Sequence, residues 1–387
     1  MKNFLILLSI SLTLYLSSAL FKLYYESKVY NKTFIADISS KEKLLSKDYV
    51  GAMFDSYLYI KNAYEIYKSS KPENCFRPQV AYFFAIFMFI FNKYFPLAII
   101  LLNSLLFAIL LAILLNLLNP NKLITNIIIL LLIFPFTFYY IPRILLEPFI
   151  TNFTLTSLIF LALRRKNFAL FFIFLASILR PEFVLLVILY GIFLKSYLLS
   201  IALTTINLIP NLILSKCRDQ TNFLNWSIVG YYEKVKNKSW EEAKKELLSK
   251  CKNLNNDCYL SFFIEEFKQN PNQIISLIAK NTILNPIKFL FFPINYKEGK
   301  RKVLNGFYFV ISIIYSIILI VSIIKQKNEK LVIYSLLTIV LFYSLFFSIN
   351  PEGFTTRFKI LLIPFETYLI AKTFSNYLLI QAFIKTL

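Results

Sequence analysis

The chain has 387 residues, of which 58% are hydrophobic and 16% are charged, and its mean hydropathy is +0.63. A soluble domain needs more polar surface, so this composition excludes an ordinary soluble protein and favours an integral membrane protein. Histidine is absent and none of the six glycines belongs to a phosphate-binding motif, which excludes imidazole catalysis and the common nucleotide-binding loops. The net charge of +21 comes mainly from Lys and Arg between apolar segments, where they orient helices, so nucleic acid is not an expected partner.

The first part of the chain predicts a membrane anchor followed by a polar loop. The apolar segment Phe4–Leu20 is long for the core of a signal peptide, so we expect an uncleaved anchor with its N-terminus inside. Residues 22–78, from Lys22 to Pro78, are polar and predict an ordered external loop with helical segments. The next apolar segment, Val80–Asn92, has 13 residues, whereas a membrane-crossing helix needs about 20. We expect this segment to lie along the membrane interface without crossing.

The orientation of the following helices rests on the positive-inside rule. If Val80–Asn92 does not cross, Leu97–Leu118 runs inward, Leu123–Ile141 runs outward and Phe149–Leu163 runs inward again. This order delivers the cluster Arg164-Arg165-Lys166 to the cytoplasm, as the rule requires. If Val80–Asn92 crossed, the same cluster would face outward.

The segment Asn167–Leu194 is apolar except for Arg180-Pro181-Glu182 at its centre. A central Arg costs on the order of 3 kcal/mol in a membrane helix, and Pro removes a backbone donor. The pattern therefore predicts two short helices that meet at an external tip. Tyr197–Leu214 then runs outward.

The segment Ser215–Arg301 is the one region that resembles a soluble domain. Tyr231–Lys250 is predicted to be an amphipathic helix, in which Ser239 and Glu242 are spaced as a capping box. Ser261–Gln269 is a second candidate helix. We expect an external helical segment without an active site of its own.

Three further apolar segments complete the predicted architecture, namely Phe307–Ile324, Leu331–Ile349 and Ile360–Phe374. The predicted fold is an all-α polytopic membrane protein with about ten transmembrane helices, a helical first external loop and a small external helical segment. The predicted domains are a transmembrane catalytic module over residues 1–214, which includes the loop 22–78, the external segment 215–301, and C-terminal transmembrane helices over 302–387.

All four cysteines fall outside the membrane in this topology, namely Cys75, Cys217, Cys251 and Cys258. One interpretation is one or two structural disulfides in an oxidising compartment, and the alternative is four free thiols.

Charged residues gather at the predicted external ends of helices: Asp55, Arg77, Arg143 with Glu147, Arg180 with Glu182, and Glu352 with Arg357. Each has an ordinary interpretation. Arg143 could be an interface anchor with Glu147 as its ion-pair partner one turn later, Arg180 could pair with Glu182, and Asp55 could be a plain loop acid. Because the charge pattern predicts one membrane face for all of them, we favour a site for an anionic ligand, with an acid or a metal nearby.

Five short motifs occur in the following order along the chain: Asp55-Ser56-Tyr57-Leu58-Tyr59, Arg77-Pro78 before an aromatic helix, Glu147-Pro148, Ile178-Leu179-Arg180-Pro181-Glu182, and Arg357-Phe358 with Pro364. This ordered set resembles the GT-C class of integral-membrane glycosyltransferases, which includes protein O-mannosyltransferases and lipid A aminoarabinose transferases. The resemblance covers residues 1–370, although many members have a larger soluble domain than the one predicted here.

The resemblance implies sugar transfer with inversion from a polyprenyl-phosphate donor to an acceptor on the external face of a bacterial or archaeal cytoplasmic membrane. The acceptor, whether a lipid, a glycan or a protein, stays open. A lipid-linked donor needs no nucleotide cofactor, which agrees with the missing glycine-rich loop.

The resemblance also implies roles for single residues. Arg357, Arg143 and Arg180 would bind the donor phosphate and neutralise the charge that develops on it. Asp55 would be the general base or, with Glu147 as partner, a ligand to a divalent metal such as Mg²⁺ or Mn²⁺. Substrate contacts would come from Tyr59, Arg77 and Glu182.

Two other functions use a similar scaffold. A transporter or lipid flippase would bind a passing anion, but it predicts charges near the membrane midplane. A polysaccharide polymerase or ligase also uses external arginines, but it needs no acid in the first external loop.

Overall fold

The computed structural model describes residues 1–45, 49–51, 56–69, 78–213, 239–250, 256–291, 302–346 and 356–375. Within these ranges the protein is all-helical, and its only β-type pairing is an isolated bridge between Thr33 and Tyr49. The chain forms two compact units. Unit 1 comprises Met1–Cys217, Ile314–Leu336 and Ile360–Leu387, and unit 2 comprises Arg218–Ile313 and Leu337–Lys359.

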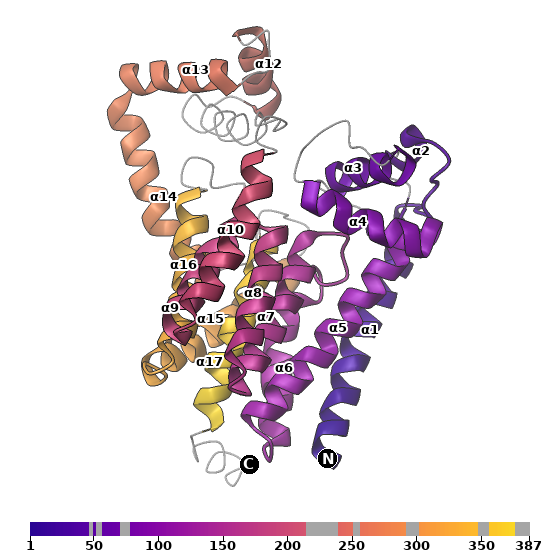
Figure 1. The fold of residues 1–387 in the computed structure, drawn as a ribbon, viewed down its shortest axis with the longest axis vertical. Helices are drawn as coiled ribbons and strands as arrows, with labels where there is room; N and C mark the ends of the chain where they lie inside the picture. The colour runs from indigo at the N-terminus through magenta and orange to yellow at the C-terminus, as the bar shows by residue number, and fades with distance from the viewer. Residues whose placement is uncertain are drawn as a thin grey trace. The chain divides into compact units, whose positions relative to one another are not determined.

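Unit 1 holds the described helices α1 to α10 of the N-terminal half together with α17 (Figure 1). They are α1 (Lys2–Val29), α2 (Lys41–Leu45), α3 (Ser56–Ser69), α4 (Pro78–Phe91), α5 (Phe95–Leu118), α6 (Leu123–Thr137), α7 (Leu146–Ala162), α8 (Lys166–Leu179), α9 (Val184–Leu194), α10 (Tyr197–Ile213) and α17 (Ile363–Ser375). Two further helices, α15 (Lys302–Lys325) and α16 (Lys330–Phe346), are divided between the units.

Two of the described helical stretches are long and apolar enough to cross a membrane, Lys2–Val29 and Gln79–Leu118. Seven shorter apolar helices of 10–17 residues follow within the described ranges. The prediction of an apolar, all-helical chain is therefore confirmed, whereas the predicted number of about ten crossings stays a prediction.

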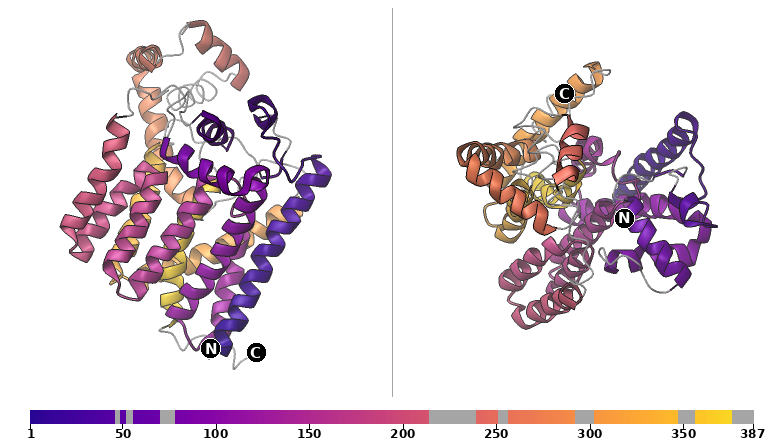
Figure 2. Two further views of the ribbon diagram at one scale, coloured as in Figure 1. Left: turned by 45° about the vertical axis from the view of Figure 1, so that its right-hand side comes forward. Right: turned by 90° about the horizontal axis from the view of Figure 1, so that it is seen from above.

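Helix α1 extends beyond the predicted boundary. Its apolar part ends near Leu20, but the helix continues to Val29 and carries Lys22 and Glu26 into buried positions. The predicted start of the loop at Lys22 is therefore wrong, because the charges of this last part of α1 meet partners elsewhere in unit 1. Along its apolar part α1 lies beside α5 (Figures 1 and 2), where Ser11 donates to the carbonyl of Ala108.

The segment predicted to lie along the interface forms its own helix, α4. A 3₁₀ turn, η1 (Asn92–Tyr94), separates it from α5, and Asn92 adopts a left-handed backbone conformation with φ 51°. Asparagine tolerates this conformation better than most residues, so the chain changes direction here. Figure 1 shows α4 and α5 as separate helices with different directions.

Helices α8 and α9 meet at the Arg-Pro-Glu sequence, as predicted. Helix α8 ends at Leu179, Arg180 is extended, and a short 3₁₀ turn, η2 (Pro181–Phe183), leads into α9. Pro181 begins this turn, where its missing amide hydrogen costs no helical hydrogen bond. At the break the amide of Arg180 donates to the Ala176 carbonyl and that of Phe183 donates to the Arg180 carbonyl.

The end of α17 is held by the connection between α5 and α6. Asn119 donates to the carbonyl of Ala371, and Lys122 donates to the carbonyls of Phe374 and Ser375. The carbonyls of Phe374 and Ser375 belong to the last turn of the helix, where no intrahelical donor remains for them. At the other end of α17, the Ile360 carbonyl accepts from Thr151 in α7.

Unit 2 contains α12 (Trp240–Lys250), α13 (Asn256–Gln269) and α14 (Pro271–Phe291), together with most of the 3₁₀ turn η5 (Thr356–Leu361). The predicted capping box is confirmed, since the Ser239 amide donates to Glu242 and the Glu242 amide donates to Ser239. The helix begins at Trp240, and residues 231–238 of the predicted helix lie outside the described residues.

Candidate functional site

Three charged side chains meet at the start of α7 and the junction of α8 and α9. The two terminal nitrogens of Arg180 each bind a carboxylate, Nη2 that of Glu147 and Nη1 that of Glu182, the latter at 2.7 Å. The side chains of Arg180 and Glu147 are 6% and 2% exposed, and that of Glu182 is 12% exposed. We call these three residues the Arg180 cluster.

Local structure explains why these side chains converge. Glu147 lies in the first turn of α7, where the positive end of the helix dipole favours a carboxylate. Arg180 is the C-cap of α8, and its extended backbone directs the chain into η2, whose second residue is Glu182. One planar guanidinium can therefore bind an acid from each of two helical elements, a geometry that lysine cannot reproduce.

The Arg180 cluster has two carboxylates for one guanidinium, so its formal charge is −1. Buried charges are tolerated only when they are paired and hydrogen-bonded, and each of these three residues also makes an interaction with residues outside the described set. Chemically, the arrangement holds two carboxyl groups at fixed positions beside a guanidinium.

A second buried ion pair lies between α1 and the connection from α6 to α7. Arg143 Nη1 donates to Glu26 at 2.8 Å, and the ring of Tyr139 lies 4.5 Å from the guanidinium carbon. The other Glu26 oxygen accepts from the Gly51 amide at 2.8 Å, and Lys32 lies 3.5 Å away. The ordinary interpretation of Arg143 as the ion-pair partner of Glu147 is therefore wrong, whereas the ordinary interpretation that Arg180 pairs with Glu182 describes a contact that forms.

Glu26 was missed by sequence reasoning because it follows the apolar part of its helix. A signal was present, since Lys22 and Glu26 are spaced one helical turn apart, and their charged groups lie 4.0 Å apart. Glu366 was missed for a similar reason. It is fully buried in α17 and accepts a hydrogen bond of 2.6 Å from Tyr315 in α15.

The first loop is fixed to the same α6–α7 connection. Ser56, the first residue of α3, donates to the Ile144 carbonyl, and the Ile144 amide donates to the Gly51 carbonyl at 3.2 Å. Both contacts lie within three residues of Glu147 in sequence. Gly51 has φ 80°, a left-handed conformation in which glycine is favoured.

Tyr59 packs in an aromatic cluster beside the start of α7. Its ring stacks on Phe84 in α4 with centroids 6.0 Å apart, and Phe149 in α7 contacts both Phe83 and Phe84. Tyr59 is buried, at 4% exposure. The described contacts give it a packing role, and its contact with substrate stays a prediction.

Several predicted site residues lie partly or wholly outside the described part of the chain. Asp55 and Arg77 lie outside the described residues, as do Cys75, Cys217 and Cys251. Arg357 belongs to η5 and Cys258 to α13, but their side chains are not described. In the described part of the chain no group of three or more Asp, Glu or Cys side chains could hold a metal ion. The predicted metal pair of Asp55 and Glu147 includes a residue outside that part.

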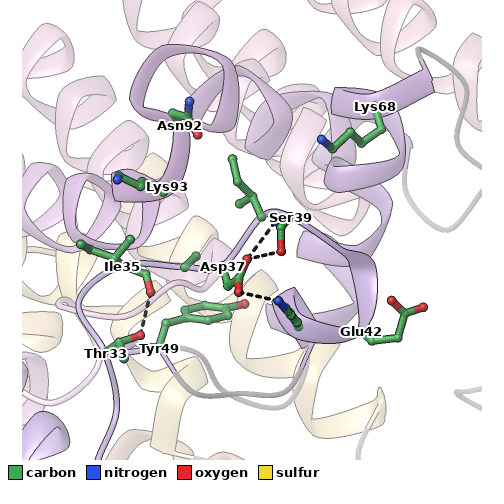
Figure 3. A pocket seen from close by; sticks show the side chains of 12 residues that line it. Thr33, Ile35, Asp37, Ser39, Glu42, Tyr49, Lys68, Asn92 and Lys93 are labelled. Atoms are coloured by element: carbon green, nitrogen blue, oxygen red, sulfur yellow. Dashed lines mark hydrogen bonds and ion pairs between the residues drawn. The ribbon is translucent and has the colours of Figure 1, made fainter.

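The first loop also forms an open pocket of about 990 Å³, lined by residues of the loop after α1, of α2 and α3, and of the turn η1 (Figure 3). The Asp37 carboxylate accepts from the Ser39 hydroxyl and amide, and Lys43 lies 3.6 Å from it. The two hydrogen bonds from Ser39 lower the pKa of Asp37 below its usual value. Asp37 therefore stays ionised at neutral pH.

Comparisons of the chain with protein-family models, with curated proteins and with solved structures found no match. The functional argument therefore rests on the residues of this chain, on the chemistry of the Arg180 cluster, and on the motif resemblance described above.

Proposed function

We propose that this protein is a multi-pass membrane glycosyltransferase that moves a sugar, with inversion, from a polyprenyl-phosphate donor to an acceptor on the external face of a bacterial or archaeal cytoplasmic membrane. The single observation that carries the proposal is the buried Arg180 cluster, because two of the motif acids and one motif arginine meet there although Glu147 and Arg180 lie 33 residues apart. Charged residues inside a membrane protein are costly, and a buried cluster of them is a candidate functional site.

The proposed reaction is a single displacement at the anomeric carbon of the donor sugar. A hydroxyl oxygen of the acceptor forms a bond to this carbon while the bond to the phosphate oxygen breaks, and the lipid phosphate leaves. Asp55 would take the proton of the acceptor hydroxyl as general base. The attachment of Ser56, which follows Asp55, to Ile144 beside α7 supports a joint role for the first loop and Glu147.

The described contacts of Arg180 and Arg143 support a different role for each of the three candidate arginines. Arg180 is bound by two carboxylates, which favours a positioning role in which it orients the Glu147 carboxylate. Arg143 is bound by Glu26 and stacks on Tyr139, which favours an anchoring role. Arg357 is then the first candidate for binding the leaving phosphate.

A divalent metal would supply electrostatic stabilisation of the leaving phosphate, with Asp55 and Glu147 as its protein ligands. Glu147 is compatible with this role because a carboxylate has acceptor sites beyond the one that Arg180 uses. The proposed reaction would need the metal only to stabilise the leaving phosphate. Removal of divalent ions by a chelator is expected to lower transfer if the reaction depends on a metal, and to leave it unchanged if it does not.

The test is a transfer assay with a purified polyprenyl-phosphate sugar donor and membrane extract as acceptor source. Asp55→Asn and Glu147→Gln are expected to lower transfer at least about 100-fold, as loss of a general base does. Glu329→Gln is the matched control, because Glu329 also pairs with a cation, Lys372, but far from the Arg180 cluster in sequence.

Full transfer by Asp55→Asn would contradict the proposed mechanism. If the wild-type protein instead moves the lipid-linked sugar across vesicle membranes and forms no glycosidic product, it is a flippase and the proposal is wrong.

A further inference from the structure

Two lysines of the first-loop pocket (Figure 3) have no carboxylate partner in the described part of the chain. Lys68 lies in the last turn of α3 and Lys93 lies in the turn η1, and both are exposed. Figure 3 shows them on opposite sides of the pocket. Asp37 and Lys43 compensate one another, and Glu42 is the remaining acid, so the pocket lining has a formal charge of +1.

The pocket is built from fixed backbone. The Ala36 amide donates to the Lys93 carbonyl at 3.0 Å, which ties the loop after α1 to the turn η1. The Val50 amide donates to the Thr33 carbonyl at 2.9 Å, beside the bridge between Thr33 and Tyr49. The turn that carries Lys93 is therefore tied to the loop after α1 by the backbone itself.

Both lysines lie over aromatic rings. Lys68 lies 5.6 Å from the ring of Tyr67, which itself packs on Phe89 of α4 at 5.1 Å, and Lys93 lies 5.5 Å from the ring of Tyr94. Lysines beside Tyr and Trp at the edge of an apolar surface are typical of the boundary between lipid tails and head groups.

An apolar surface adjoins these rings. Four residues of α4 are 49–65% exposed, namely Tyr82, Ile86, Phe89 and Ile90, and their spacing places them along one side of the helix. We call them the outer face of α4. The opposite side, with Phe84 and Met88, is buried. Exposed apolar surface of this kind needs a covering partner, and the lysines and tyrosines at its edge specify a lipid layer.

We propose that the first-loop pocket binds the phosphate head group of an anionic membrane lipid through Lys68 and Lys93, while the acyl chains of that lipid lie along the outer face of α4. The phosphate would accept hydrogen bonds from both ammonium groups, which are strong because donor and acceptor are charged. The site is independent of sugar transfer, and it would hold the first loop against the membrane surface.

The test compares binding of a short-chain phosphatidylglycerol and a short-chain phosphatidylcholine to the full-length protein in neutral detergent, by native mass spectrometry. The anionic lipid is expected to bind about 30-fold more tightly, which is the ratio that two lysine contacts to a head group give. In the double variant Lys68→Gln/Lys93→Gln the two lipids are expected to bind equally. Lys28→Gln/Lys61→Gln removes the same charge from lysines outside the pocket and is expected to keep the ratio.

Two further measurements complete the design. Ile86→Gln/Ile90→Gln is expected to weaken the binding of both lipids while the ratio between them stays. Glycerol phosphate, which has the head group without acyl chains, is expected to bind at least tenfold more weakly than the anionic lipid. Equal binding of glycerol phosphate and the anionic lipid, or an unchanged ratio in Lys68→Gln/Lys93→Gln, would overturn the proposal.

Discussion

The guanidinium of Arg143 lies 2.8 Å from the carboxylate of Glu26, although 117 residues separate them in the sequence. The same carboxylate accepts from the amide of Gly51, so one acid joins α1, the first loop and the α6–α7 connection. A single buried contact therefore links three parts of unit 1 that are far apart in sequence.

Removal of one member of this pair is expected to destabilise the protein strongly. Arg143→Met leaves the Glu26 carboxylate buried without its main cation, which costs about 3–5 kcal/mol of unfolding free energy. The measurement is denaturant unfolding in detergent. Adding Glu26→Gln to Arg143→Met is expected to recover part of the loss, because the buried carboxylate that lost its main cation is then replaced by a neutral amide.

The control for this experiment is Lys43→Met, because the pair of Lys43 with Asp37 is exposed, at 64% and 53%. Its loss is expected to cost less than about 1 kcal/mol. Equal losses of unfolding free energy in Arg143→Met and Lys43→Met would contradict the prediction that the buried pair of Arg143 with Glu26 stabilises the protein more than the exposed pair does.

Arg180→Lys is expected to separate two roles of this arginine. A single ammonium cannot bind Glu147 and Glu182 as the guanidinium fork does, so a positioning role predicts a kcat lower by about 100-fold at an unchanged KM for the donor. Direct contact with the donor phosphate predicts a raised KM instead. Arg165→Lys, at an exposed arginine before α8, is the control and is expected to leave both constants unchanged.

Gly191→Ala is expected to disturb the packing of α9 on α10. A Cβ atom at Gly191 would overlap the Cβ of Ser200, and overpacking of this kind costs about 1–3 kcal/mol. Ser200→Gly in the same chain is expected to restore part of the stability, although it removes the hydrogen bond from Ser200 to the Val187 carbonyl. A double variant no more stable than Gly191→Ala alone would contradict this explanation.

The proposed topology predicts opposite accessibility for two exposed lysines of unit 1. In a chain whose four cysteines are replaced by serine, Lys28→Cys at the end of α1 is expected to react with an impermeant thiol reagent on intact cells. Lys195→Cys, between α9 and α10, is expected to react only after the cells are opened. The reverse pattern would place the Arg180 cluster on the cytoplasmic side and would remove the basis of the proposed function.

The apolar helices could be predicted closely from the sequence. Helix α5 was expected to begin at Leu97 and begins at Phe95, and the expected and the observed helix both end at Leu118. These boundaries were predictable because length and hydrophobicity are local properties of the chain. The same property explains the error at α1, whose polar end is stabilised by Arg143 and Gly51, residues that no local pattern connects to it.

The candidate site was predictable only in part for the same reason. The pair of Arg180 and Glu182 lies within three residues, so sequence reasoning found it, whereas the contact of Arg180 with Glu147 depends on how α7 packs against α8. Spacing alone suggested Arg143 as the partner of Glu147. Arg143 instead precedes α7, in a connection where helical spacing does not apply, and it turns toward α1.

The hydrogen bonds from Asn119 and Lys122 to the C-terminal end of α17 have a consequence for biosynthesis. Asn119 and its acceptor, the Ala371 carbonyl, are separated by 252 residues, so the helices around α17 are made long before it. At a translation rate of roughly 5–20 residues per second, this interval lasts on the order of 10–50 seconds. Unit 1 therefore spends most of its synthesis with a vacant position among α5, α6 and α7, and it can reach its final packing only after nearly the whole described chain has left the ribosome.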